Sequence, residues 1–276
     1  MFLANIEEII PESSVICVSP HYDDFLFFLG GYVLELKSKG LLHTKKFTNI
    51  STFSRSNYQV DDEVGNRDRS LVRVQKATGI RFIEDLQCLD ALFGPHNYTY
   101  RVMGEEEALV RGAPVSGGDG EMEMSVGSYD SIQEQDWEIL RRMEVCIREL
   151  AATSDTAIVL PLAMKSHIDH FIVREAGVRV KSGENVKATF YFAEDKPYAG
   201  LMTAKDSAIN DDFIDQHKLI PCAFTHHPKE LIQLAYDHFP SQTDGVYDEG
   251  IYNRSNQLKQ IYNTDTDCDR IYKYND

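Results

Sequence analysis

Short, mostly apolar runs alternate along the chain with longer segments in which apolar residues recur every three or four positions. The short runs predict buried β-strands at VICVS (15–19), FTNISTFS (47–54), part of FIEDLQCLDAL (82–92), TAIVLPL (156–162) and ATFYFAED (188–195). The longer periodic segments predict α-helices at 25–40, 67–79, 131–150 and 229–239, with another helix beginning near Ser166.

Strands and helices that alternate in this way are typical of a parallel sheet covered by helices on both faces. The expected fold class is therefore α/β, a Rossmann-like arrangement with a mostly parallel sheet. With 276 residues and no internal repeat or low-complexity linker, residues 1–276 are interpreted as a single domain. In such sheets, ligands bind beyond the carboxyl ends of the strands.

Residues 94–130 interrupt this alternation. The segment is rich in glycine and acidic residues and has no sustained period, so we interpret it as a long acidic insertion over the site. The run GEEE (104–107) within it is interpreted as a group of solvated charges.

Composition narrows the possible partners and location. The 28 basic and 44 acidic residues give a formal charge of −16, which disfavours nucleic-acid binding. No apolar run approaches the roughly 18 residues of a membrane span, and the N-terminus has no basic region typical of a secretory signal. Five scattered cysteines without a CxxC motif suit a reducing compartment, so we expect a cytoplasmic protein. The sequence does not define the oligomeric state, and a homo-oligomer is compatible with it.

Two polar clusters follow predicted strands. The first contains His21, Asp23 and Asp24, and the second, HIDH (167–170), follows the strand at 156–162. Imidazole nitrogens and a carboxylate suit a divalent transition metal, zinc above all. His21, Asp24 and one histidine of the second cluster would provide three ligands and leave a position for water, as in catalytic zinc sites.

In that arrangement the second aspartate has a separate role. A carboxylate that does not bind the metal can accept a proton from activated water as a general base. HxxD and HxxH also occur by chance, often on exposed helices. The position of both clusters just after predicted strands favours one shared metal site.

These residues resemble a known family. VICVSPHYDDFLFFLGG is similar to the signature of the PIG-L/LmbE-like zinc de-N-acetylases, an apolar strand, P-H-P-D-D-E and a helix, and HIDH is similar to their later H-P-D-H. The resemblance extends from about residue 14 to 195, and weakly to SQ at 241–242. It implies zinc ligands at His21, Asp24 and His170, a general base at Asp23, and an intermediate-stabilising histidine at His167.

The resemblance also implies three further roles. Asp169 would orient a neighbouring histidine, Arg67 would bind substrate, and Asp90, at the end of DLQCLD, would bind sugar hydroxyls. The sequence departs from the family pattern at four positions, which puts the substrate in doubt: Tyr22 and Ile168 replace prolines, and Phe25 and Ser70 replace glutamates.

The resulting expectation is a zinc-dependent N-deacetylase that hydrolyses a small N-acetylated sugar or glycoconjugate. Two alternatives remain at this point. A metal-dependent phosphoesterase would need two metals and basic groups for phosphate, which this acidic chain supplies sparsely. A non-catalytic sugar-binding protein with the same fold is suggested by the departures at Phe25 and Ser70.

Overall fold

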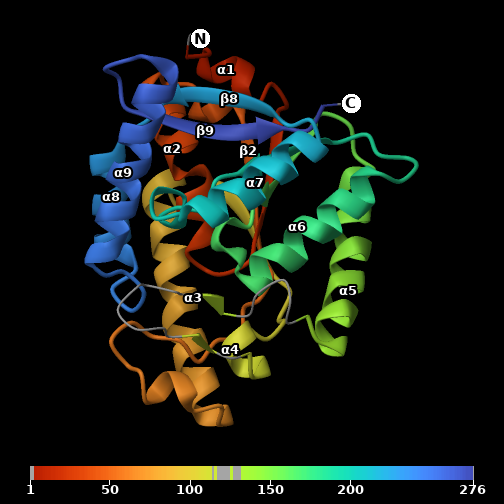
Figure 1. The fold of residues 1–276 in the computed structure, drawn as a ribbon, viewed down its shortest axis with the longest axis vertical. Coiled ribbons are helices and arrows are strands. Elements are labelled where there is room, and N and C mark those ends of the chain that lie inside the picture. Colours follow the sequence, from red (N-terminus) through yellow and green to blue (C-terminus); the bar gives the residue numbers. More distant parts are fainter. Residues whose placement is uncertain (1–2, 114, 117–124, 127–131, 276) are drawn as a thin grey trace.

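A computed structural model describes residues 3–113, 115–116, 125–126 and 132–275. Its main sheet has seven strands in the order β3-β2-β1-β6-β7-β9-β8. Figure 1 shows β8 and β9 at the end of the molecule where α1 lies. The strands are β1 (Ser14–Ser19), β2 (Lys46–Ser51), β3 (Tyr98–Val102), β6 (Thr156–Pro161), β7 (Thr189–Ala193), β8 (Ile220–Thr225) and β9 (Cys268–Lys273). All neighbouring pairs from β3 to β7 are parallel, whereas β9 is antiparallel to both β7 and β8. The expected Rossmann-like fold class is confirmed.

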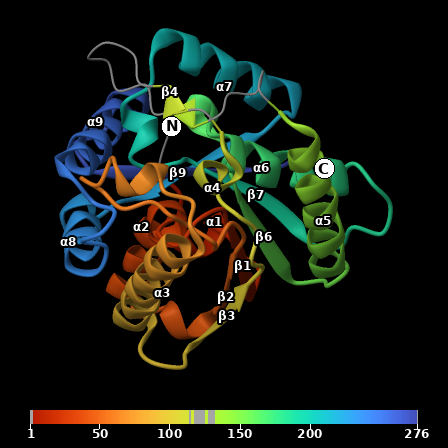
Figure 2. The same cartoon turned by 90° about the horizontal axis from the view of Figure 1, so that it is seen from below.

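Helices cover both faces of the sheet, as Figure 2 shows. One face carries α2 (Asp24–Ser38), α3 (Leu71–Phe93) and α8 (Pro228–His238), and the other carries α5 (Glu134–Ala151) and α6 (Ile168–Lys181). The other α-helices in the described part of the chain are α1 (Ile6–Ile9), α4 (Ala108–Arg111), α7 (Ala204–Gln216) and α9 (Gly245–Tyr262). No helix among the described residues is long and apolar enough to cross a membrane.

Each face of the sheet has its own hydrophobic core. In β6, Ala157 and Val159 pack with α2 and α8, while Ile158 and Leu160 pack with α5 and α6. Side chains of a strand point alternately to opposite faces, so a strand buried on both sides is apolar throughout. This explains why the runs at 15–19 and 156–162 were recognisable in the sequence.

The strand order reverses between β1 and β6. After β1, the chain builds β2 and β3 on one side and then crosses to build β6 and β7 on the other. Pairing of β1 with β6 stops at Cys17 and Val159, whereas pairing with β2 continues to Ser19 and Ser51. The carboxyl ends of β1 and β6 therefore separate at the switch point, where ligands bind in open α/β sheets.

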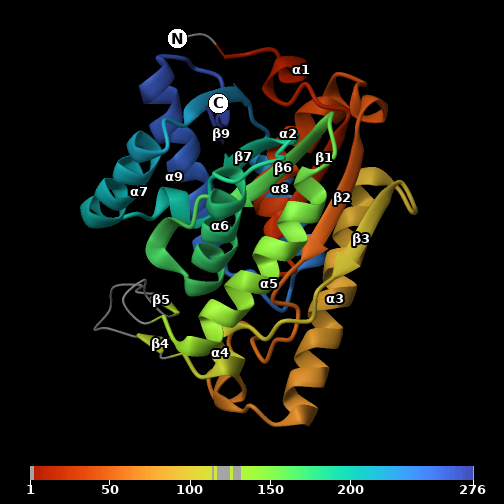
Figure 3. The same cartoon turned by 90° about the vertical axis from the view of Figure 1, so that its right-hand side faces the viewer.

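The structure corrects two sequence predictions in the region after β2. Residues 82–92 are not a strand, because α3 runs without a break through Gly79 from Leu71 to Phe93. The third parallel strand is β3, which lies within the segment interpreted as an insertion and forms one edge of the sheet (Figure 3). The predicted insertion at 94–130 thus begins with a sheet strand and continues into α4, and much of its remainder lies outside the described residues.

A buried ion-pair cluster fixes α9 to the sheet. The Glu194 carboxylate, at the end of β7, accepts two hydrogen bonds of 2.6 Å from Arg254 of α9 and further ones from Arg270 of β9. Burial alone would raise the pKa of Glu194, but the two guanidinium groups lower it to about 2. A carboxylate held in this way stabilises the fold while it is ionised.

We predict that Glu194→Gln lowers the free energy of unfolding by about 3–5 kcal/mol at neutral pH, because it leaves buried guanidinium groups without their counter-charge. The folded pKa lies below the unfolded value of about 4.3. The stabilisation is therefore complete above pH 4.3 and is lost as pH falls through about 2.

Urea denaturation at several pH values measures the difference between wild type and variant. The exposed Glu184, changed to Gln, serves as control and should shift stability by less than about 0.5 kcal/mol. A difference that stays constant down to pH 2 would contradict the ion-pair explanation.

Candidate active site

The segments after β1 and β6 line a common cavity of about 420 Å³. Seven of the eight residues singled out from the sequence line it: His21, Asp23, Asp24, Arg67, His167, Asp169 and His170. Two of these residues lie at the start of α2 and three at the start of α6. The carboxylates of Asp23, Asp24 and Asp169 thus also meet the positive ends of helix dipoles.

Three donor atoms from the two strand ends converge. His21 Nδ1 lies 3.2 Å from Asp24 Oδ2 and 3.2 Å from His170 Nε2, and His170 Nε2 lies 3.5 Å from Asp24 Oδ2. Asp24 Oδ2 also accepts a hydrogen bond of 2.6 Å from the backbone N–H of His21. The three side chains are buried, which limits competition from water.

Two further carboxylates determine how the imidazoles face this point. His21 Nε2 lies 3.1 Å from Asp169 Oδ2, and His170 Nδ1 makes a short contact with Asp195. A carboxylate at one ring nitrogen favours the proton there and leaves the lone pair on the other nitrogen. The lone pairs of His21 Nδ1 and His170 Nε2 then point to the same place as Asp24 Oδ2.

This donor set fits a divalent metal. Donors arranged tetrahedrally around zinc, at roughly 2.0–2.2 Å from the ion, lie about 3.3–3.6 Å from one another, close to the three separations above. Burial alone would lower the pKa of His21 and of His170, but Asp169, Asp24 and Asp195 raise both. The lone pairs of His21 and His170 face each other beside the Asp24 carboxylate, so this arrangement is stable only with a cation between them, either a proton or a metal ion.

Asp23 is placed differently from its neighbour. It is the N-cap residue of α2, yet its side chain makes no capping hydrogen bond and instead lines the cavity. Burial and the adjacent Asp24 carboxylate raise the pKa of Asp23 to about 6, although Arg81 acts in the opposite direction. A carboxyl group of this kind can both accept and return a proton near neutral pH.

His167 lies beside the donor set. Its ring centroid is 4.9 Å from that of His21 and 5.0 Å from that of His170, and its Nδ1 accepts a hydrogen bond from the backbone N–H of Asp169. One ring nitrogen from each of His21, His167 and His170 lies within 4.8 Å of the other two, so the three could share a metal ion. Burial and the two neighbouring histidines lower the pKa of His167 well below its usual value.

Asp90 is the one predicted site residue that the structure does not bring to the cavity. It is exposed near the end of α3, and its carboxylate accepts a hydrogen bond of 2.9 Å from the Tyr98 hydroxyl. The resemblance placed Asp90 in the segment 82–92, which was expected to hold a strand, but this segment is helical. The acidic residue that follows the real third strand and lines the cavity is Glu107.

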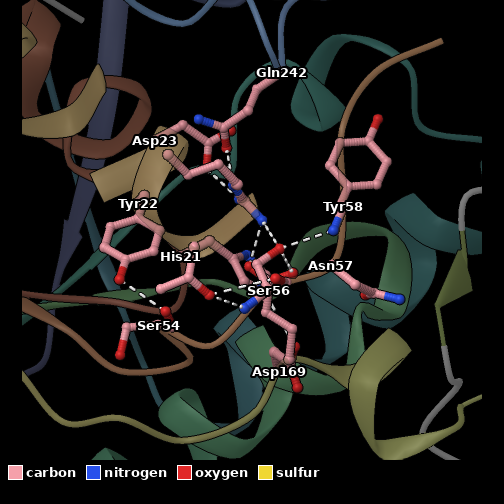
Figure 4. A network of polar contacts seen from close by, with 12 residues as sticks. His21, Tyr22, Asp23, Ser54, Ser56, Asn57, Tyr58, Asp169 and Gln242 are labelled. Atoms are coloured by element: carbon pink, nitrogen blue, oxygen red, sulfur yellow. Dashed lines mark hydrogen bonds and ion pairs between the residues drawn. The ribbon is translucent and has the colours of Figure 1, made fainter. Parts of the chain in front are cut away.

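Glu107 also corrects the interpretation of GEEE as solvated charges. Its side chain is only 4% exposed. One carboxylate oxygen accepts a hydrogen bond of 2.6 Å from Ser56, and the other makes a short contact with Arg81. Figure 4 shows the surrounding network, which connects Asp23, Ser56 and Gln242.

Two departures from the family pattern lie outside the cavity lining. The Tyr22 hydroxyl donates a hydrogen bond of 2.7 Å to the backbone oxygen of Ser54, and Phe25 packs edge-on against the rings of Phe47 and Phe93. Both side chains are 1% exposed. Both side chains therefore belong to the packing beneath the site and are not part of its polar lining.

Several cavity residues were missed by sequence reasoning. Asp195, which contacts His170 from behind the cavity lining, was also missed, although it is the last residue of the predicted strand at 188–195. Gln242 had only the weak signal of the SQ pair at 241–242. Other lining residues that sequence reasoning did not single out as site residues include Tyr58, Arg81, Lys196, Tyr198 and Tyr247.

No known family model and no curated protein sequence matches this chain. Solved structures do resemble it. A deacetylase–teicoplanin complex from the teicoplanin biosynthesis pathway superposes with a TM-score of 0.63 at 16% identity, covering 94% of this chain and 97% of the other. The A40926 pseudoaglycone deacetylase Dbv21 gives 0.58 at 14% identity, with coverage of 96% and 99%. A zinc-inhibited form of the teicoplanin deacetylase Orf2 gives 0.62 at 16% identity, with coverage of 94% and 97%. This chain thus has the fold of these deacetylases.

We predict that the protein binds about one zinc-type ion per chain and that His170→Ala abolishes this binding. Asp195→Asn should weaken it by about 10- to 100-fold, because the His170 ring loses its orienting carboxylate. Competition with a chromophoric chelator measures both affinities.

His43→Ala is the matched control, since this exposed histidine lies on a short 3-10 helix, Leu42–Thr44, away from the cavity. Wild-type affinity in His170→Ala would rule out the donor set described here.

Proposed function

We propose that this protein is a metal-dependent hydrolase that removes an N-acetyl, or more generally N-acyl, group from an amino-sugar-like substrate. The main observation behind the proposal is that His21 Nδ1, Asp24 Oδ2 and His170 Nε2 converge in one cavity. The same cavity is lined by Asp23, whose carboxylate makes no capping hydrogen bond to α2. The fold shared with deacetylases and the two motifs similar to those of PIG-L/LmbE-like enzymes support it.

His21, Asp24 and His170 would hold the metal, zinc being the ion that this donor set suits best. When bound, such an ion lowers the pKa of water and polarises a carbonyl group. Asp169 keeps His21 in the required tautomer, and Asp195 does the same for His170.

The remaining groups move protons. The Asp23 carboxylate accepts a proton from the attacking water as the C–O bond forms. A hydrogen bond from His167 stabilises the oxyanion that develops on the former carbonyl oxygen. Asp23 then returns this proton to the departing nitrogen as the C–N bond breaks, so the products are an amine and acetate.

Three tyrosines from separate segments support a ring-shaped substrate. Tyr58 follows β2, Tyr198 begins a 3-10 helix after β7, and Tyr247 lies in the first turn of α9, and all three line the cavity. Their rings offer apolar faces for stacking and their hydroxyls offer hydrogen bonds, which together match a pyranose. Arg67 adds a cation to the same lining.

The charges of the cavity favour amide hydrolysis over phosphoester hydrolysis. Of its three lysines and arginines, Arg81 is paired with Glu107 and Lys196 with Asp269, so only Arg67 has no carboxylate partner among the described residues. The departure at Phe25 no longer supports the alternative of a non-catalytic sugar-binding protein, because the Phe25 side chain packs in the core.

We predict that the wild-type protein releases free amine from at least one member of a panel of N-acetyl amino sugars and that a chelator abolishes the release. Asp23→Asn should keep the metal but lower kcat by at least about 100-fold, because the amide side chain cannot accept the proton. A fluorogenic amine assay measures turnover, and elemental analysis measures metal content.

Asp90→Asn is the control for this experiment and should retain wild-type turnover, since Asp90 lies outside the cavity lining. The hydrolase proposal fails if the metal-loaded wild-type protein releases neither amine nor acetate from any panel member.

We further predict that Tyr247→Ala raises KM for an N-acetyl amino sugar by about tenfold, which corresponds to roughly 1.4 kcal/mol of lost binding. The same variant should treat N-acetylethanolamine, which has no ring, as the wild type does. Steady-state kinetics on both substrates measures the difference. Equal losses on the two substrates would assign Tyr247 a structural role.

A further inference from the structure

Arg81 of α3 is a buried arginine in the cavity wall, and its side chain joins three segments that are distant in sequence. Its Nε donates a hydrogen bond of 2.6 Å to Gln242 Oε1, and its Nη1 donates one of 2.6 Å to Ser56 Oγ and makes a short contact with the Glu107 carboxylate. The side chain is 4% exposed. These contacts fix the plane of the guanidinium group.

The remaining nitrogen of this group faces Asp23. Arg81 Nη2 lies 3.7 Å from Asp23 Oδ1, and both residues line the cavity. Burial alone would lower the pKa of Arg81, but Glu107 and Asp23 raise it, so the guanidinium group stays charged. Asp23 thus has a fixed positive charge beside it that compensates its proximity to Asp24.

Asp23 has an alternative position that Arg81 opposes. An aspartate at an N-cap ordinarily accepts a hydrogen bond from the backbone N–H two or three residues later, here that of Phe25 or Leu26. The Asp23 side chain makes no such bond. The Leu26 N–H already donates to the backbone oxygen of Asp23 at 3.1 Å, so the Phe25 N–H is the one available to a cap. Without the guanidinium group, repulsion from Asp24 and the attraction of this N–H would both favour rotation of Asp23 away from the cavity.

We propose that Arg81 is the positioning residue of Asp23: it holds the Asp23 carboxylate in the cavity and is itself held by Gln242, Ser56 and Glu107. The proposal rests on the proposed function, in which Asp23 is the general base. It assigns a role to Gln242 as well, because this residue from the C-terminal part of the chain holds Arg81 Nε.

The kinetic test compares Arg81→Met with wild type on the panel substrate that is hydrolysed fastest. We expect kcat to fall by at least about 30-fold while KM changes less than about threefold, because the base and not substrate binding is affected. Metal content should be unchanged. Loss of metal, or a rise in KM alone, would overturn the proposal.

A double-mutant cycle separates action through Asp23 from a general effect on the fold. In an Asp23→Asn background, Arg81→Met should lower the residual kcat by less than about threefold, since the group that it positions is already inactive. Additive losses would overturn the proposal.

Millimolar guanidinium ions should restore part of the turnover of Arg81→Ala by occupying the vacated position.

Arg254→Met is the matched control, because Arg254 is also a buried arginine with a carboxylate partner but does not line the cavity. At a temperature where it is folded, this variant should keep the wild-type kcat, and guanidinium ions should not change it.

A crystal structure of metal-loaded Arg81→Met tests the proposal without turnover. The Asp23 carboxylate should then be rotated away from the cavity, towards the N–H of Phe25. An unmoved Asp23 would overturn the positioning role even in the absence of a known substrate. Absence of turnover in the wild-type protein would instead count against the proposed function alone.

Discussion

The candidate site depends on compensation of negative charge inside a largely buried cavity wall. Asp23, Asp24 and Asp169 are at most 8% exposed, and isolated carboxylates in such surroundings are strongly destabilising. Each has a cationic counterpart: Arg111 donates to Asp169 at 2.7 Å, Arg81 faces Asp23, and the histidine pair surrounds Asp24. Only the last of these compensations requires a proton or a metal ion, which is where the proposed chemistry takes place.

The parts of the site that sequence reasoning found are local. His21 lies three residues before Asp24, the first residue of α2, and the position of both after an apolar strand is visible in the sequence itself. The same holds for His167 and His170 at the start of α6. The meeting of the two clusters followed from the parallel strand order, because adjacent parallel strands end at the same edge of the sheet.

The helix α3 could not be recognised in full for a physical reason. Its buried positions recur with helical spacing along the whole length, but the buried face changes from apolar residues to Arg81, Glu84 and Asp85 where it meets the polar network. A pattern based on hydrophobicity loses the helical period there, and FIEDLQCLDAL then favours a strand. Because 82–92 was predicted to hold a strand, Asp90 was expected at the site, whereas the structure leaves it on the surface of α3. Glu107 was interpreted as one of several exposed charges, although it is buried.

The partners of buried charges could not be predicted from short stretches of sequence either, because they lie far away along the chain. Glu107 is the one member of its acidic run that is buried, and its counter-charge Arg81 lies 26 residues earlier in the chain. Gln242, which completes the same network, is 161 residues from Arg81. The SQ pair is thus explained by what its side chains bind: Ser241 and Gln242 both donate to Glu84, and Gln242 also holds Arg81. Through these contacts α3 connects the C-terminal part of the chain to Asp23, so the cavity wall and the polar network form one interdependent unit.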